Sequence, residues 1–288
     1  MANLPDGLEW TAVVVAAQRA VESLSAAPAF RDPLAEAVVT HLGLAEPGEP
    51  PRFEDMPGDM AGVTKFVGPI VVLRTLHYDR VLTDAGLDQV VLLGAGLDGR
   101  AYRLPWAGRR IFELDLPAGL LLKAEAARAA GLEPIADRVP VPVDLAAEWA
   151  PVLLEAGFDP ERPTAWVAEG LLLYLTRDQA DQLMTRVHEL SAPGSRFCLD
   201  VVETLGERFS AVDDDGGRRA ASVMRHGPPT PPHDWLAAHG WSPDAVTLVE
   251  LGDRYGRTIT PGFDPGQGGA RLWCFDSAAL PRGSRPRS

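Results

Sequence analysis

The chain has 288 residues, a formal net charge of −13 and 2 cysteines. This length fits one large α/β domain with a cap, or at most two domains. The acidic charge argues against a nucleic-acid surface, which needs clustered lysine and arginine to displace counterions. Because the chain has neither a run of about 18 apolar residues nor a signal-peptide pattern at its N-terminus, we expect a cytoplasmic protein that does not engage a membrane.

Three helices are predicted in the first part of the chain, because apolar residues recur there at helical spacing. We expect Gln18 and Arg19, which interrupt the apolar face of the first helix, to lie on a solvated face rather than in a ligand site. Pro33 suits the first turn of the second helix, and Pro69 should bend or break the third. The predicted helices cover residues 8–24, 30–42 and 60–82, and together they would form an N-terminal helical cap over residues 1–84.

A buried strand ending at a glycine-rich turn is predicted next. Four apolar residues, 90–93, precede the run Gly94-Ala95-Gly96-Leu97-Asp98-Gly99. Glycines at such a turn let the backbone approach a ligand closely. The string also matches the dinucleotide fingerprint G-x-G-x-x-G, and Asp115 follows about 20 residues on, where a ribose-binding acid is expected.

Two features favour S-adenosyl-L-methionine over NAD at this turn. The dinucleotide fingerprint needs a helix after its third glycine, but Pro105 leaves room for little more than one helical turn. Asp98 would repel a diphosphate, whereas a carboxylate suits a ligand that carries an ammonium and a sulfonium. An NAD-dependent oxidoreductase and a turn that binds nothing remain the alternatives.

Strands and helices then alternate, which is typical of a doubly wound parallel sheet. Thr176 is a plausible N-cap for one of the helices. We expect the last strand to be an edge strand or a hairpin partner. The predicted strands cover residues 110–114, 139–143, 165–168, 196–202, 245–249 and 271–275, and the predicted helices cover residues 120–130, 177–190 and 233–239.

Acidic residues stand at or just after the carboxyl ends of four strands: Asp98, Asp115, Asp144 and Glu169. In an open α/β sheet these ends form the ligand crevice. One such acid could be a helix cap, but four together indicate a binding site. A cationic ligand with ribose hydroxyls and an adenine amino group could use all four as hydrogen-bond acceptors.

The remaining segments carry less information. Contiguous acids at 213–215 before two glycines predict a solvated loop, and we expect no metal site there. Cys198 and Cys274 lie far apart in predicted strands, which predicts buried free thiols. We expect an insertion at about 205–235 to cap the substrate site and the tail, 281–288, to be disordered. The domain that follows the helical cap would then span residues 85–280.

With these motifs in place, the chain resembles the leucine carboxyl methyltransferase-like family of S-adenosylmethionine-dependent methyltransferases, especially its bacterial branch of small-molecule O-methyltransferases. The resemblance covers nearly the whole chain. It rests on Thr11-Ala12, Phe30-Arg31-Asp32-Pro33-Leu34, Arg74, residues 91–104, Phe112-Glu113-Leu114-Asp115-Leu116-Pro117, Val143-Asp144-Leu145, residues 168–175, Gly240-Trp241 and Leu272-Trp273-Cys274.

The resemblance implies an α/β Rossmann-like methyltransferase sheet of seven strands and a set of cofactor-binding residues. In that set, Arg74 binds the cofactor's carboxylate, Asp115 holds the ribose hydroxyls, and Glu169 lies at the methionine side. The glycine turn lines the methionine moiety, and Asp144 with Leu145 meets the adenine edge. The full set is Arg74, Gly94, Ala95, Gly96, Asp98, Asp115, Leu116, Asp144, Leu145, Glu169 and Gly170.

The chain departs from the family's pattern at Gly99, and one contact of the family has no assigned residue here. Gly99 stands where the family usually has threonine, so a hydroxyl contact is missing and we expect a looser turn. The family's basic contact in the first helix falls near Gln18 or Arg19 and is not assigned. For Arg74, the alternative is a surface cation paired with Asp79.

We therefore predict transfer of methyl from S-adenosyl-L-methionine to a carboxylate or hydroxyl of a small molecule in bacterial natural-product biosynthesis. The main alternative is methylation of a protein C-terminal carboxylate. A hydroxyl acceptor needs a base, and a carboxylate does not. No catalytic residue is assigned: the base candidates are His77, His226 and His233, and Tyr102 and Tyr174 could orient the acceptor.

Overall fold

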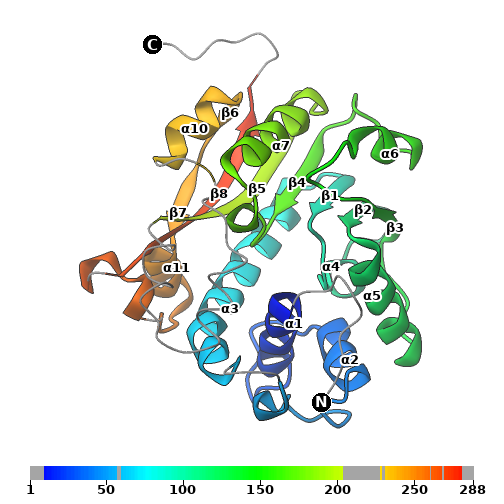
Figure 1. Cartoon of the computed structure of the whole chain (residues 1–288), viewed down its shortest axis with the longest axis vertical. Coiled ribbons are helices and arrows are strands. Elements are labelled where there is room, and N and C mark those ends of the chain that lie inside the picture. The colour runs from blue at the N-terminus through cyan, green and yellow to red at the C-terminus, as the bar shows by residue number, and fades with distance from the viewer. Residues whose placement is uncertain are drawn as a thin grey trace.

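The structure is a computed structural model, and it describes residues 10–56, 60–203, 228, 231–259, 261–267 and 269–280. In Figure 1 the N-terminal helices gather beside one face of a central sheet. Most of the predicted insertion at 205–235, the acids at 213–215, His226 and the tail 281–288 lie outside the described residues. Within the described part, no helix is long and apolar enough to cross a membrane.

Within the described residues, the sheet has eight strands in the order β3-β2-β1-β4-β5-β8-β6, with β7 paired to β8. Strands β1 to β5 are parallel, and β8 runs antiparallel to β5. The strands are β1 (Gln89–Leu93), β2 (Arg110–Asp115), β3 (Asp137–Pro142), β4 (Thr164–Ala168), β5 (Arg196–Glu203), β6 (Trp241–Ser242), β7 (Ala245–Thr247) and β8 (Arg271–Ala279).

The predicted doubly wound α/β sheet is confirmed, with one strand more than the seven expected. The extra strand arises because β6 and β7, which are only two and three residues long, both pair with β8. Residues 271–275 form a strand that pairs antiparallel with the preceding strand β7, as a hairpin partner would, but the prediction of an edge strand is wrong. The segment belongs to β8, which lies between β5 and the short strands β6 and β7.

Three helices precede the sheet, as predicted: α1 (Trp10–Ser23), α2 (Pro33–His41) and α3 (Met60–Ala85), with a short 3-10 turn, η1 (Phe53–Asp55), before α3. Asp32 begins α2, because its side chain accepts the backbone N–H of Ala35. The expected break at Pro69 is absent, since α3 is one helix through that residue. A Cβ on Gly68 would come within 2.7 Å of Gln18 Oε1, so α1 packs closely against α3 at this point.

The other helices connect the strands. Thr176 caps α7 in a capping box with Gln179, which confirms the predicted N-cap. Helices α6 and α11 were not predicted. The predicted strand at 245–249 is wrong beyond Thr247, which ends β7 and caps α11 in a capping box with Glu250. The set is α4 (Arg100–Arg103), α5 (Pro117–Ala129), α6 (Ala150–Glu155), η2 (Leu172–Tyr174), α7 (Arg177–Glu189), α10 (Pro232–Ala238), α11 (Leu248–Tyr255), η3 (Pro261–Phe263) and η4 (Pro265–Gln267).

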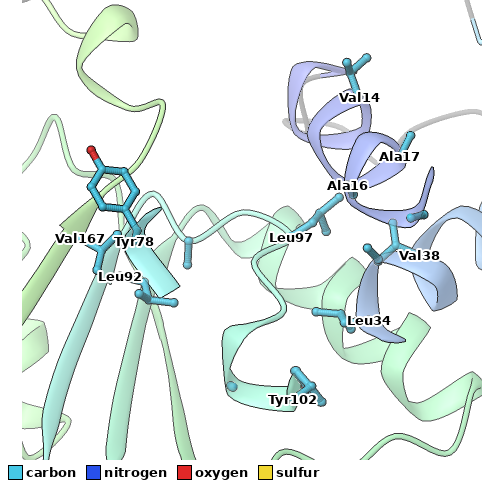
Figure 2. Packing of buried hydrophobic residues seen from close by; sticks show 14 of the residues in the cluster. Val14, Ala16, Ala17, Leu34, Val38, Tyr78, Leu92, Leu97, Tyr102 and Val167 are labelled. Atoms are coloured by element: carbon cyan, nitrogen blue, oxygen red, sulfur yellow. The ribbon is translucent and has the colours of Figure 1, made fainter. Parts of the chain in front are cut away.

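Two hydrophobic cores cover the two faces of the sheet, because successive strand residues point to opposite sides. In β1, Val90 and Leu92 belong to one core and Val91 and Leu93 to the other. The first core also contains residues of α1, α2 and α3. Figure 2 shows Ala16 of α1 near Leu97 of the glycine turn, and Tyr78 of α3 near Leu92 and Val167 of the sheet. The N-terminal helices therefore share a core with the sheet that carries the turn. Both cysteines are buried and free, as predicted.

Candidate functional site

A pocket with a cavity of about 240 Å³ lies at the carboxyl ends of β1, β2 and β4 and is covered by α1 and α3. It forms where sequence reasoning placed the ligand crevice, because β1 is the central strand at which the order of the parallel strands reverses. Its lining residues are Thr11, Ala12, Val15, Arg19, Arg74, residues 92–98, Asp115, Val167, Glu169, Gly170, Leu171 and Tyr174.

The glycine turn after β1 brings bare backbone to this pocket. Gly94 and Gly96 have φ of 65° and 45°, in the left-handed region that favours glycine. A Cβ on Gly94 would lie 3.0 Å from Leu171 Cδ1, so a larger residue would also crowd the opposite wall. The following helix, α4, is only four residues long, as Pro105 predicted. The turn therefore has no long helix behind it, and its Ala95, Gly96 and Asp98 amides donate hydrogen bonds within the protein.

Asp115, at the end of β2, is bound to this turn. One carboxylate oxygen accepts the Gly96 N–H, and the other accepts the Leu116 N–H at 2.6 Å. Burial raises the pKa of Asp115, although both amide contacts act to lower it. Each oxygen keeps a second lone pair, so the carboxylate can hold the turn and still accept hydrogen bonds from a ligand.

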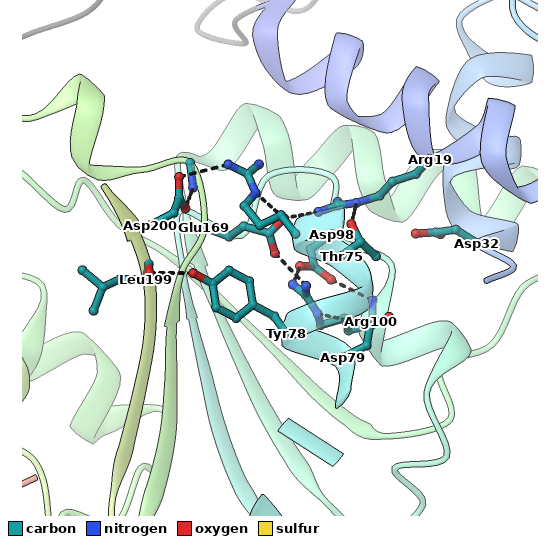
Figure 3. Close-up of polar contacts among 12 residues, drawn as sticks. Arg19, Asp32, Thr75, Tyr78, Asp79, Asp98, Arg100, Glu169, Leu199 and Asp200 are labelled. Carbon is teal, nitrogen blue, oxygen red and sulfur yellow. Dashed lines mark hydrogen bonds and ion pairs between the residues drawn. The ribbon is translucent and has the colours of Figure 1, made fainter. Parts of the chain in front are cut away.

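Glu169, just past β4, is contacted by three arginines from three different helices (Figure 3). Its Oε1 accepts from Arg19 Nη2 and from Arg74 Nε, each at 3.0 Å, and its Oε2 accepts from Arg100 Nη2 at 2.6 Å. Burial alone would raise the pKa of this carboxyl, but the charges of the three arginines hold it well below its usual range. Glu169 is therefore an ionised group that joins α1, α3 and α4 to the sheet.

Arg74 is buried in this cluster and lines the pocket. Besides Glu169, its Nη1 contacts Asp200 Oδ2 at 3.0 Å. The alternative of a surface cation paired with Asp79 is wrong, because Asp79 instead contacts Arg100 and Arg103. Two buried carboxylates thus hold the Arg74 guanidinium beside the pocket.

The acid in the glycine turn is not a free negative charge. Asp98 accepts the Arg100 backbone N–H at 2.7 Å through Oδ1 and contacts Arg100 Nη1 through Oδ2. Burial would raise its pKa, but Arg100 and Arg19 lower it below its usual value. Arg100 compensates the negative charge of Asp98. The prediction that Asp98 repels a diphosphate did not include this ion pair.

Three predicted cofactor-binding residues lie outside the pocket lining. Asp144 is exposed, and its Oδ1 accepts the Ala146 N–H at 2.8 Å. Leu145 packs against the core on the face of the sheet away from α1. Leu116 follows Asp115 and is 42% exposed. The predicted contact of Asp144 and Leu145 with the adenine edge therefore stays a prediction.

Of the base and acceptor-orienting candidates, Tyr174 alone lines the described pocket. His77 is buried elsewhere, and burial together with the charge of Arg254 lowers its pKa to about 4. His233 packs edge-on against Trp273 and Phe275. The ring of Tyr102 faces the guanidinium of Arg138, outside the pocket.

Sequence reasoning missed three residues of the charge cluster. The first is Arg19, which donates to Thr75 Oγ1 at 3.3 Å as well as to Glu169. Both Arg19 and its neighbour Gln18 are buried, so the expectation that they lie on a solvated face is wrong. The second is Arg100, for which the sequence predicted a place in a short helix but no ion pair. Asp200 had a signal in the sequence, since it is an acid in the middle of an apolar strand, and such a residue needs a buried partner.

Gly99 leaves no gap in the turn. The expectation of a looser turn is wrong, because a Cβ there would lie 2.1 Å from Asp32 Oδ1. Its φ of −96° is open to any residue, so the constraint is space. Asp32 is fully buried, caps α2 and lies 3.3 Å from Arg103 Nε. The carboxylate of Asp32 occupies the position that a side chain at 99 would need.

Comparison with known proteins places these features in one family. The leucine carboxyl methyltransferase family profile matches residues 12–188. A proposed S-adenosyl-L-methionine-dependent methyltransferase of Streptomyces avermitilis is 42% identical over 265 residues, covering 89% of this chain and 90% of the relative. One from Streptomyces coelicolor is 42% identical over 278 residues, covering 92% of this chain and 94% of the relative.

Solved structures agree with the fold. The crystal structure of a proposed methyltransferase from Thermobifida fusca superposes with a TM-score of 0.52 at 14% identity and covers 94% of both chains. A DUF574 family protein from Streptomyces avermitilis gives a TM-score of 0.52 at 11% identity, covering 92% of this chain and 97% of that one. At these identities the likeness is one of fold.

The contact between Gly99 and Asp32 predicts the effect of a methyl group at position 99. Gly99→Ala should lower the free energy of unfolding by about 1–3 kcal/mol, as overpacking in a filled site does. Urea unfolding measures this change. In an Asp32→Ala background the penalty of Gly99→Ala should vanish, because the clashing carboxylate is gone. An equal penalty in both backgrounds would show that Asp32 is not the obstacle.

Proposed function

This chain belongs to the leucine carboxyl methyltransferase family, and we propose that it transfers the methyl group of S-adenosyl-L-methionine to an oxygen atom of a small-molecule acceptor. The observation that carries the proposal is the pocket at the end of β1, where a glycine turn, an acid on β2 and two arginines from the helical cap converge. Family membership does not support the alternative of an NAD-dependent oxidoreductase.

The residues of the pocket fit this cofactor at both ends. Arg19 and Arg74 reach the pocket with planar guanidinium groups, which suit a carboxylate. Asp115 offers lone pairs to the two ribose hydroxyls, and the turn from Gly94 to Gly96 suits the methionine chain. Glu169 is held by three arginines, so we propose that it orients Arg19 and Arg74 toward the cofactor's carboxylate. The cofactor supplies an already activated methyl group.

Within this assignment, the other predicted contacts remain part of the proposal. Asp144 and Leu145 would meet the adenine edge at the open side of the pocket, next to Leu116. Asp98 would support the turn through Arg100 rather than bind the cofactor directly. Gly170 would give the methionine chain room beside Arg74, because a Cβ on Gly170 would come within 3.3 Å of Arg74 Nη2.

The pocket favours a carboxylate over a hydroxyl as acceptor. Among the described residues that line it there is no histidine, lysine or cysteine. Its carboxylates are engaged: Asp98 and Glu169 by arginines, and Asp115 by two backbone amides. A hydroxyl acceptor would need a base to take its proton, whereas a carboxylate is ionised at neutral pH. Tyr174 would orient the acceptor by hydrogen bonding.

The chemical nature of the product tests this choice. With tritium-labelled S-adenosyl-L-methionine and a panel of small carboxylic acids, alcohols and phenols, we expect label only on the carboxylic acids. The methylated product should release volatile labelled methanol in base, because esters hydrolyse there and methyl ethers do not. Base-stable label on a phenol or alcohol would overturn the choice of acceptor, and label only on a protein C-terminus would favour protein methylation.

Replacing Asp115 tests the ribose contact. Asp115→Ala should weaken S-adenosylhomocysteine binding by roughly 2–4 kcal/mol, as expected when charge-assisted hydrogen bonds are lost in a buried site. Isothermal titration calorimetry measures this, and Asp115→Asn, which keeps one acceptor oxygen, should lose less. Asp137→Ala, at the other end of the sheet, is the matched control. An affinity within about threefold of the parent would make the ribose assignment wrong.

Replacing Arg74 tests the carboxylate contact. Arg74→Lys keeps the charge but loses the planar fork, so the affinity for S-adenosylhomocysteine should fall by about tenfold to a hundredfold. The affinity for 5′-methylthioadenosine, which lacks the amino-acid group, should stay unchanged. A parallel fall for both ligands would mean that Arg74 supports the pocket without meeting the carboxylate.

A further inference from the structure

Asp200 is a buried acid that the proposed function has not yet used. It lies in the middle of β5 between Leu199 and Val201 and is 3% exposed. Removing a carboxylate from water costs several kcal/mol unless partners compensate it. Its partners therefore indicate why an acid occupies this position.

The two oxygens of Asp200 hold two different walls of the pocket. Oδ1 accepts the backbone N–H of Gly170 at 2.6 Å, and Oδ2 accepts from Arg74 Nη1 at 3.0 Å. Gly170 belongs to the loop after β4, whereas Arg74 comes from α3. Figure 3 shows Asp200 beside Glu169. One side chain thus links the strand, the loop and the helix.

The contacts of Asp200 fix the orientation of the Arg74 guanidinium as well as its position. Glu169 binds Nε of this group and Asp200 binds Nη1, so two carboxylates define its plane. Gly170 has a φ of 68°, and a Cβ there would lie 3.3 Å from Arg74 Nη2. The Gly170 backbone, which Asp200 also holds, therefore lies against the guanidinium.

A second ion pair that involves strand β5 provides a comparison. Asp276 of β8 binds Arg196 of β5 through Nε at 2.8 Å and through Nη2. Neither residue lines the described pocket. The pair of Asp276 and Arg196 joins strands only, whereas Asp200 joins two residues that both line the pocket.

We propose that Asp200 is a positioning residue for the amino-acid end of the cofactor: it holds the Arg74 guanidinium and the Gly170 amide in the arrangement that receives this end. The inference rests on the proposed function, because it assigns the amino-acid end of S-adenosyl-L-methionine to Arg74. Asp200 acts through Arg74 and Gly170 and does not itself meet the cofactor.

The test is Asp200→Asn, which preserves shape. Its amide oxygen can still accept the Gly170 N–H, but its NH₂ group then faces Arg74 and cannot accept from it. We expect the affinity for S-adenosylhomocysteine to fall by about tenfold or more. The affinity for 5′-methylthioadenosine should stay within about threefold of the parent. Isothermal titration of both ligands gives the ratio, and Asp276→Asn should leave both affinities unchanged.

Several outcomes would overturn the proposal. An equal loss for both ligands would show a general structural role, and no loss for either would show no role in binding. If Asp200→Asn does not fold, Asp200→Glu keeps the charge but is one methylene longer. It should displace Arg74 and show the same selective loss, and parental affinity for both ligands would then refute the proposal. Failure of the parent to bind S-adenosylhomocysteine would instead refute the proposed function.

Discussion

The ion cluster around Glu169 is the interaction on which the rest of this structure depends. A carboxylate at the end of a buried strand would be costly alone. Here guanidinium groups from α1, α3 and α4 contact it, and each of these helices reaches it from a different part of the chain. Because the three arginines come from the helices and the acid from the sheet, the charges and the shared core together hold the cap over the pocket.

The parts of the site that depend on local sequence were predictable. The apolar run and glycines fixed the strand and turn at 90–99, and Pro105 limited the helix that follows. Asp115 was predicted as a ligand-binding residue because it directly follows the predicted strand at 110–114. The fold followed from the alternation of strands and helices, while β6 and β7 were missed or extended because two or three residues carry almost no periodicity.

The charge cluster was not predictable, because its pairs are far apart in the chain. Arg19 and Glu169 are separated by 150 positions, and Arg74 and Asp200 by 126. Sequence reasoning therefore treated Asp98 and Glu169 as free acceptors for a cationic ligand, when arginines already neutralise them. The looser turn expected at Gly99 was wrong for the same reason. The side chain that fills the space beside Gly99 is Asp32, which caps α2 and is distant in the chain.

The charges at the pocket also bear on the proposed reaction. Among the described residues that line the pocket, Arg19 and Arg74 stand against Asp98, Asp115 and Glu169, which leaves one net negative charge. That single negative charge complements a cofactor whose carboxylate, ammonium and sulfonium sum to one positive charge.

The sulfonium of the methyl donor and the carboxylate of an acceptor both lose their charges as they react. Such a reaction is favoured where water is excluded. For this chemistry the protein needs no base. It needs an acceptor held in line with the methyl group, within about 3–3.5 Å. The arginines and the acid on β5, which we propose to hold the amino-acid end of the cofactor, would serve that alignment.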